Sequence, residues 1–126
     1  MVKTFGEVIE KAREILNDKY PEAYRWKDPQ LLRFAYDGIT YLNKIRPESR
    51  YSGVELVVLN IPKIEDEINN VELMQLKDAP VPLDERWIAV ITHFIAGTAL
   101  GLDDSDTLNA SRAATQMALV QTMAET

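Results

Sequence analysis

Hydrophobic side chains recur at helical spacing in four stretches of the chain, and these stretches predict four helices. The predicted helices cover residues 5–16, 29–45, 83–100 and 107–124. The first follows a capping-box pair, Thr4 and Glu7. The second follows Asp28, read as an N-cap, with Pro29 at the first helical position.

Two of the predicted helices are more apolar than an ordinary surface helix. In the helix over residues 29–45, hydrophobic side chains spread over roughly 220° of the helical wheel, against a usual stripe of somewhat over 100°. Such a helix is either central in a bundle or shared between the core and a partner. The helix over residues 83–100 has almost no polar face, so we expect it to be the core helix. Near its end, the small residues of Ala96-Gly97-Thr98-Ala99-Leu100-Gly101 let another backbone approach closely, and Gly101 is a candidate C-cap.

The middle of the chain has a different pattern. Two β-rich runs, residues 54–59 and 71–76, predict two strands, and the second run alternates well. The polar stretch between them, residues 62–70, is too long for a tight hairpin turn and predicts a projecting loop. The sequence therefore predicts a mainly α fold. It is a single four-helix domain over residues 1–126, with a two-stranded β excursion and a long loop inserted at residues 51–82.

Composition agrees with one folded domain. The chain has 126 residues, of which 46% are hydrophobic and 27% charged, and it has no Cys. The lack of Cys excludes disulfides, a Cys zinc site and a Cys nucleophile. The longest apolar run, residues 87–102, is short of the roughly 20 apolar residues that span a bilayer. Residues 1–7 do not have the pattern of a signal peptide. We therefore expect neither a membrane span nor export.

The negative charge is concentrated in the second half of the chain. The formal net charge is −6, with +1 in residues 1–60 and −7 in residues 61–126. An acidic surface is repelled by phosphate backbones, which disfavours sequence-independent DNA binding through a basic face.

No group of residues predicts catalysis. His93 is the only histidine and has no Asp or Glu three or four positions away, so a metal site is not expected. No Gly-x-Ser-x-Gly motif is present to position a serine nucleophile. The acidic residues Asp103, Asp104 and Asp106 lack the glycine and glutamate of a calcium loop, which favours helix capping. We expect a protein that is not an enzyme and has no cofactor and no metal.

Residues 19–27 mix cations with aromatic side chains, a composition used to stack single-stranded nucleic acid. Three interpretations are open for this segment: nucleic-acid stacking, packing within the fold, and contact with a protein. Packing is favoured because Trp26 precedes a predicted helix, where it can act as a hydrophobic staple.

Several segments in order resemble a known family. The first helix ends in Ile15-Leu16-Asn17-Asp18, the next loop ends in Arg25-Trp26, and the second helix opens with Asp28-Pro29-Gln30-Leu31-Leu32-Arg33 and closes at Arg46-Pro47. A hydrophobic helix, an acidic joint at residues 103–106 and a last helix carrying Arg112-Ala113 follow. This arrangement resembles the adaptor proteins of tailed-phage necks, which are head-tail connector or head-completion proteins.

The resemblance implies a structural virion protein. It implies a homo-oligomer, a dodecameric ring beneath the portal protein that extends the DNA channel toward a downstream tail or stopper protein. DNA would pass through this channel without specific binding, and no membrane is involved. The protein would be made in the host bacterial cytoplasm and reside in the virion neck.

The resemblance and the apolar surfaces together give three sets of candidate residues. The candidate subunit contacts are Phe34, Tyr41, Ile45, Ala110 and Met117. The candidate portal-docking residues are Gln116, Leu119, Val120 and Met123. The candidate residues of a loop facing the lumen or the tail are Glu65, Asp66 and Glu67.

Two other classes of protein are open. One is a small acidic helical binding module or regulator that occupies a host protein surface. The other is a small enzyme, for which no candidate residues form a constellation. Portal, capsid and terminase genes beside this one would favour the neck protein.

Overall fold

The computed structural model describes residues 3–18, 20, 24–52, 55–65, 67–102 and 107–125, without the side chains of residues 52, 107–110 and 125. Its elements in order are α1 (Phe5–Leu16), α2 (Asp28–Ile45), the 3-10 helix η2 (Pro47–Arg50), β1 (Tyr51–Ser52), β2 (Glu55–Leu56), α3 (Asn70–Asp78), α4 (Glu85–Leu102) and α5 (Thr107–Glu125). The expected mainly α fold is confirmed, but the described residues contain five α-helices, one more than expected.

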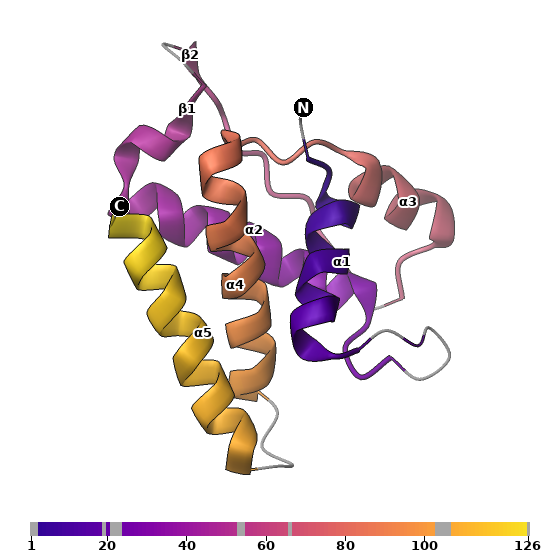
Figure 1. Cartoon of the computed structure of the whole chain (residues 1–126). Coiled ribbons are helices and arrows are strands. Elements are labelled where there is room, and N and C mark those ends of the chain that lie inside the picture. The colour runs from indigo at the N-terminus through magenta and orange to yellow at the C-terminus, as the bar shows by residue number, and fades with distance from the viewer. Residues whose placement is uncertain are drawn as a thin grey trace.

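α4 occupies the centre of the fold. In Figure 1, α1 and α5 lie on either side of it and α2 passes behind it, and α4 packs against all three. Burial on several sides at once explains why this helix has almost no polar face. The predicted core helix is therefore confirmed. Its buried residues are Trp87, Val90, Ile91, Thr92, Ile95, Ala96, Gly97, Ala99 and Leu100.

α2 is also largely buried within the chain. Seven of its hydrophobic side chains belong to the core: Leu31, Leu32, Phe34, Ala35, Tyr36, Ile39 and Leu42. Its wide apolar surface is thus mostly accounted for by intrachain packing. The expected N-cap at Asp28 is wrong, because the helix already includes Asp28 and Lys27 is the N-cap residue, without a side-chain cap. The Asp28 carboxylate is engaged elsewhere.

α1 begins as the sequence predicts. Thr4 Oγ1 accepts a hydrogen bond from the Glu7 backbone N–H, and Glu7 Oε1 accepts one from the Thr4 backbone N–H, each at 3.2 Å. These reciprocal bonds satisfy two donors at the helix start, as a capping box does. The hydrogen bond from the Thr4 backbone lowers the pKa of Glu7 below its usual range. The helix ends at Asn17, whose φ of 55° is left-handed.

The strand predicted over residues 71–76 is wrong, because these residues lie in helix α3. Asn69 caps this helix by accepting a hydrogen bond from the Glu72 backbone N–H at 2.8 Å. Leu73 and Leu76, three residues apart, pack against the core. Over only six residues, apolar side chains two or three positions apart fit both the period of two of a strand and the period of 3.6 of a helix. The Asn69 cap favours the helix.

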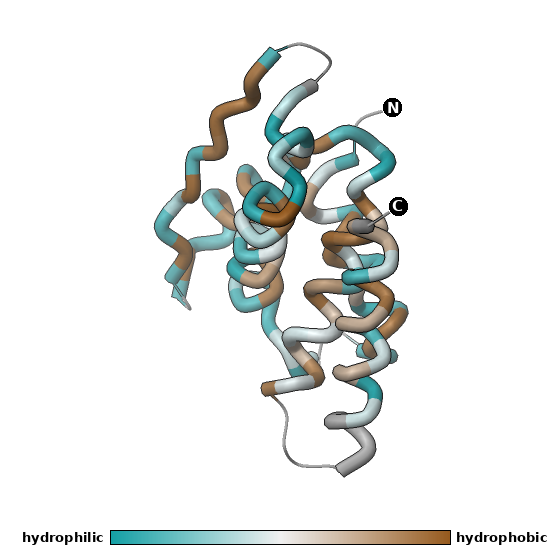
Figure 2. The backbone as a smooth tube through the Cα atoms, turned by 90° about the vertical axis from the view of Figure 1, so that its left-hand side faces the viewer, coloured by the Kyte–Doolittle hydropathy of each residue, from teal (hydrophilic) through white to brown (hydrophobic). Residues whose placement is uncertain are grey.

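The only sheet in the described residues is short and local. β1 and β2 pair antiparallel, with Tyr51 opposite Leu56. In the described residues, the strand predicted over residues 54–59 is reduced to Glu55 and Leu56, which pair with β1. After β2 the chain continues without regular secondary structure, and Figure 2 shows this stretch as an extended, largely hydrophobic trace at the edge of the molecule. We call residues 55–64 the arm.

α5 packs closely along α4. A Cβ atom on Gly97 would lie 2.8 Å from Met117 Sδ and 3.2 Å from Gln116 Cβ, so the absence of a side chain permits this approach. Close packing near the end of α4 is thus seen at Gly97, where the neighbouring atoms belong to side chains of α5. The C-cap expected at Gly101 is wrong, since α4 continues to Leu102. The acidic joint at residues 103–106 lies outside the described residues.

Candidate functional site

A buried ion cluster joins three helices. Arg13 at the end of α1 is 1% exposed, and its guanidinium pairs with Asp18 at 2.8 Å and with Asp28 at 2.5 Å. Lys77 of α3 pairs with the other oxygen of Asp28 at 2.9 Å. The Tyr24 ring lies 3.5 Å from the guanidinium carbon of Arg13. The cluster thus ties together the end of α1, the start of α2 and the end of α3.

The same cluster fixes the loop between α1 and α2. Asp18 accepts hydrogen bonds from the backbone N–H groups of Arg25, at 2.9 Å, and Trp26, at 3.3 Å. Burial raises the pKa of Asp28, but hydrogen bonds from Arg13 and Lys77 outweigh it and hold the pKa below the usual aspartate range. Asp28 is therefore an anionic partner for the buried arginine.

This geometry supports packing as the role of residues 24–28. Trp26 is 5% exposed and belongs to the core, and Tyr24 is covered by Arg13. The Trp26 ring is therefore not available for stacking on a nucleotide base, and Arg13 occupies one face of the Tyr24 ring. Within the segment, Tyr20 is the described aromatic side chain that stays exposed. The residues that carry the family resemblance here are thus residues that stabilise the fold.

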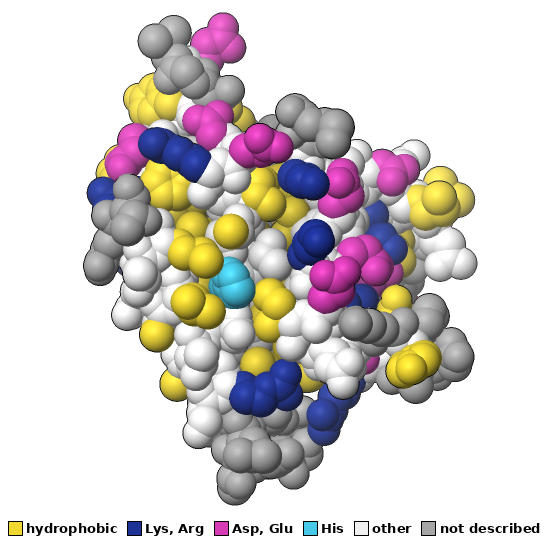
Figure 3. All heavy atoms as spheres, viewed as in Figure 1, with side chains coloured by type: hydrophobic (Ala, Val, Ile, Leu, Met, Phe, Trp, Pro, Cys, Tyr) yellow, Lys and Arg dark blue, Asp and Glu magenta, His cyan; other side chains and the backbone are white. Residues whose placement is uncertain are grey.

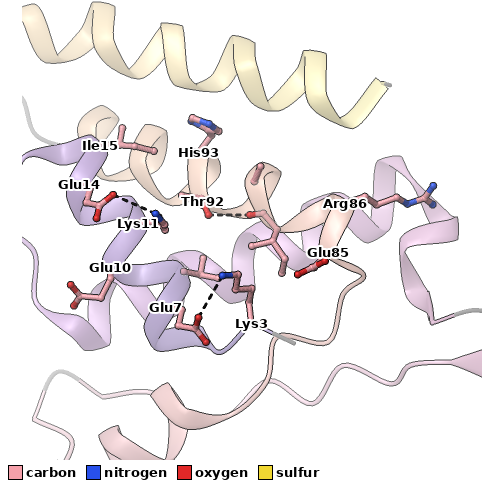
Figure 4. A pocket seen from close by; sticks show the side chains of 13 residues that line it. Lys3, Glu7, Glu10, Lys11, Glu14, Ile15, Glu85, Arg86, Thr92 and His93 are labelled. Carbon is pink, nitrogen blue, oxygen red and sulfur yellow. Dashed lines mark hydrogen bonds and ion pairs between the residues drawn. The ribbon is translucent and has the colours of Figure 1, made fainter. Parts of the chain in front are cut away.

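An open groove of about 820 Å³ lies between α1 and α4 (Figure 4). Val8, Ile15, Ile88 and Ala89 provide apolar lining. Charged side chains form its edges. Two ion pairs lie along the α1 edge, Lys3 with Glu7 at 3.6 Å and Lys11 with Glu14 at 3.8 Å. Arg86 points away from α1 in Figure 4, and its guanidinium lies over the Trp87 ring.

α5 borders the same face of the molecule. His93 Nδ1 lies 2.5 Å from Gln116 Oε1, which joins α4 to α5, and Arg112 Nη2 donates to the Ile15 carbonyl oxygen at 3.2 Å. Figure 3 shows hydrophobic side chains around the histidine, with acidic side chains on the α1 side. An apolar floor with charged edges suits binding of a partially apolar segment.

The candidate subunit contacts differ in their exposure. Ile45 is 42% exposed at the end of α2, whereas Phe34 is buried in the core. Tyr41 is half-buried, with its ring 5.5 Å from that of Phe94. Met117 lies at the α4–α5 contact. The side chain of Ala110 lies outside the described residues.

The candidate portal-docking residues also separate into two groups. Leu119 is 37% exposed on the outer face of α5. Val120 is fully buried and Met123 packs against the core, while Gln116 contacts His93. The sequence grouped these four residues on one helix, but the packing of α5 on α4 turns Val120 inward.

The tip residues predicted for the loop are exposed where the structure describes them. Glu65 and Glu67 are exposed, and Lys63 pairs with Glu65 at 3.3 Å. Asp66 lies outside the described residues. The described residues contain no group of three or more His, Asp or Glu side chains placed to hold a metal ion. Across the described helices, none is long and apolar enough to cross a membrane.

Sequence reasoning missed two exposed apolar patches. The arm patch comprises Leu56, Val58 and Ile61, which are 58%, 71% and 61% exposed. The α3 patch comprises Val71 and Met74, which are 69% and 63% exposed. The sequence contains a signal for the arm patch. Residues 56–59 are all apolar, and in an extended chain alternate side chains point to opposite faces, so both faces of this segment are apolar while only one can pack on the core.

No protein-family model, no curated protein and no solved structure matches this chain.

Proposed function

We propose that this protein is a head-tail adaptor of a tailed phage, a subunit of a ring beneath the portal that extends the DNA channel to the tail. The observation that carries the proposal is the outer face of α5. This helix packs along α4, and its described contacts with other parts of the chain include two hydrogen bonds near its ends, from Arg112 to Ile15 and from Arg46 to Ala124. Its other side is open.

The composition of that open side favours contact with another protein. Its eight exposed residues between positions 111 and 124 are Ser111, Arg112, Ala114, Thr115, Ala118, Leu119, Gln121 and Thr122. Arg112 is the one charged residue among them, whereas a solvent-facing helix surface is normally rich in charge. Low charge and small side chains reduce the desolvation cost of docking.

A second observation supports a subunit with neighbours. The arm patch and the α3 patch are different surfaces of one chain, and a ring requires two different, complementary surfaces on each subunit. The resemblance of residues 4–47 and 83–124 to phage adaptors adds the portal and the tail as partners. The acidic second half suits a channel wall past which DNA moves without binding.

The exposed fractions refine the residue roles. Leu119 is the candidate anchor for the portal, and Ile45 is retained as a subunit contact. Phe34 and Val120 support these surfaces from the core, because both are buried within the chain. Glu65 and Glu67 are the described residues assigned to the lumen or the tail.

The test is cosedimentation of the purified protein with the portal oligomer encoded in the same genome. We expect a ring-sized complex with about one copy per portal subunit, since the contact repeats with the ring symmetry. Leu119→Glu should weaken it. Tyr20→Glu is the matched control, because it also places an acid at an exposed apolar position, on the α1–α2 loop. No association across a range of salt concentrations would refute the proposal.

The groove between α1 and α4 favours one second candidate, a binding module that occupies a host protein surface. Its apolar lining and charged edges are those of a site that takes a peptide or helix. The two candidates differ in the effect of Ala89→Arg, a change in the groove at an exposed position. A binding module would lose its partner, whereas portal association through α5 would persist.

A further inference from the structure

The groove between α1 and α4 has two helical walls of similar length (Figure 4). Within α1 its lining runs from Glu7 to Ile15, and within α4 from Glu85 to His93. Each of these spans rises about 12 Å, at about 1.5 Å per residue. The groove is therefore about two helical turns long. Over that length a helix presents apolar side chains spaced three, four and seven residues apart, the pattern by which a helix docks in a groove.

The backbones of both walls are already hydrogen-bonded. α1 and α4 are α-helices, so the N–H and C=O groups along them pair within each helix. None of the described lining residues belongs to a strand, so an extended segment would find no edge to pair with. A helix, in contrast, satisfies its own backbone groups. The walls offer only side chains to an occupant, and this favours a helix over an extended peptide.

The cations that line the groove are engaged within the chain. Lys3 and Lys11 form the two ion pairs along the α1 edge. The guanidinium carbon of Arg86 lies 4.4 Å from the centroid of the Trp87 ring, and this side chain points away from α1 in Figure 4. An acidic occupant would therefore have to compete with contacts that these cations already make.

Two carboxylates of the lining are unpaired. Glu10 of α1 and Glu85 of α4 are exposed, and neither forms an ion pair with any residue that the structure describes. They belong to opposite walls, so an occupant between the two helices meets a negative charge on each side. Cationic side chains on both flanks of its apolar face would complement these charges, and complementary charges favour association with the right partner.

A second copy of this chain does not supply such a helix from its described residues. On the described helices, Val71 and Met74 of α3 are the one pair of exposed large hydrophobic side chains spaced three or four residues apart. The exposed charges beside them are acidic, Glu72 and Asp78, and would be repelled by the unpaired carboxylates of the groove. α5 has a single exposed large hydrophobic residue, Leu119. The occupant is therefore a segment of a different protein.

We infer that the groove between α1 and α4 binds a basic amphipathic helix of a partner protein. The apolar face of that helix packs on the apolar lining of the groove, and its Lys or Arg side chains lie beside Glu10 and Glu85. This inference rests on the groove as a protein-binding site, which is the second candidate function, and it adds the conformation and the charge of the partner. It does not require the portal contact proposed for α5.

Designed peptides test the conformation and the charge of the occupant. The probe is a fluorescein-labelled peptide of about four helical turns, with Leu three and four residues apart on one face and Lys on both flanks. Two matched peptides each differ in one respect: one has Glu in place of every Lys, and the other has the same composition with Leu at every second position. Fluorescence anisotropy with the full chain should show saturable binding of the basic helical peptide. Each matched peptide should bind at least about tenfold more weakly.

Variants at exposed positions locate the binding in the groove. Ala89→Arg obstructs the apolar lining, and Glu10→Lys combined with Glu85→Lys reverses the two unpaired charges. Each of these two proteins should bind the basic helical peptide about tenfold more weakly. Glu67→Lys combined with Glu72→Lys is the matched control, because it makes the same change in net charge at exposed carboxylates outside the groove. The control should bind as the unmodified chain does.

The outcomes separate this inference from the proposed functions. Equal binding of the basic and acidic peptides, or an equal loss in the control, would overturn the basic occupant and leave the groove as a binding site. Tighter binding of the alternating peptide would overturn the helical occupant. No binding of the basic helical peptide, or binding unaffected by Ala89→Arg, would overturn the inference altogether. All groove variants should still cosediment with the portal oligomer if the adaptor proposal is correct, so that proposal is tested independently.

Discussion

Removal of Arg13 should destabilise the fold more than removal of any surface charge. The guanidinium is 1% exposed and pairs with two carboxylates, of which Asp18 is 7% and Asp28 17% exposed. Arg13→Met keeps an unbranched apolar side chain but leaves Asp18 buried with only backbone donors. Breaking a buried ion pair from one side costs about 3–5 kcal/mol. We expect a value near 3 kcal/mol, because Lys77 still pairs with Asp28.

Urea unfolding followed by tryptophan fluorescence measures this loss. Both tryptophans, Trp26 and Trp87, are buried and report on unfolding of the core. With an m-value of about 1.5 kcal/mol/M, the midpoint should fall by about 2 M. Lys11→Met is the control, because its ion pair with Glu14 is exposed and should contribute less than about 1 kcal/mol. Equal losses in the two variants would refute the importance of the cluster.

Three further predictions concern stability. Because the pKa of Asp28 is lowered in the folded state, its contribution is complete above the unfolded-state value and declines below about pH 4; the stability difference between the protein and Asp28→Asn, from urea unfolding at several pH values, should shrink over that range. Gly97→Leu should cost about 1–3 kcal/mol, because its side chain would meet Met117 and Gln116 where α5 packs on α4, and an unchanged thermal midpoint would contradict that packing. Asn69→Ala should cost about 1 kcal/mol by removing the α3 cap, seen as faster hydrogen exchange in α3, whereas uniform exchange rates would argue against the cap.

The sequence predicted the long helices because their signals are local. The capping box at Thr4, the proline at position 29 and the apolar run of α4 each act within a few residues. α3 was missed because six residues do not distinguish a period of two from one of 3.6, and Asn69 was read as part of a loop.

The candidate surfaces were harder to predict than the helices. The sequence shows that Leu119 and Val120 are both apolar, but the packing of α5 on α4 decides which of them is exposed. The role of Asp28 likewise depends on Arg13 and Lys77, which are distant in sequence. These pairings depend on tertiary contacts. The hydrophobic pattern of the sequence therefore predicts the helices, but tertiary packing determines which of their faces are exposed.

The two anchors of the arm determine how much ordering a partner would have to impose on it. Because hydrogen bonds at Val57 and Ile64 already hold the segment extended, a partner does not have to order it on arrival. Ordering a free segment costs backbone and side-chain entropy for each residue, and that cost lowers affinity. A pre-ordered arm avoids most of this cost. Its association should therefore be accompanied by a heat-capacity change that reflects buried apolar area alone, without a contribution from coupled folding.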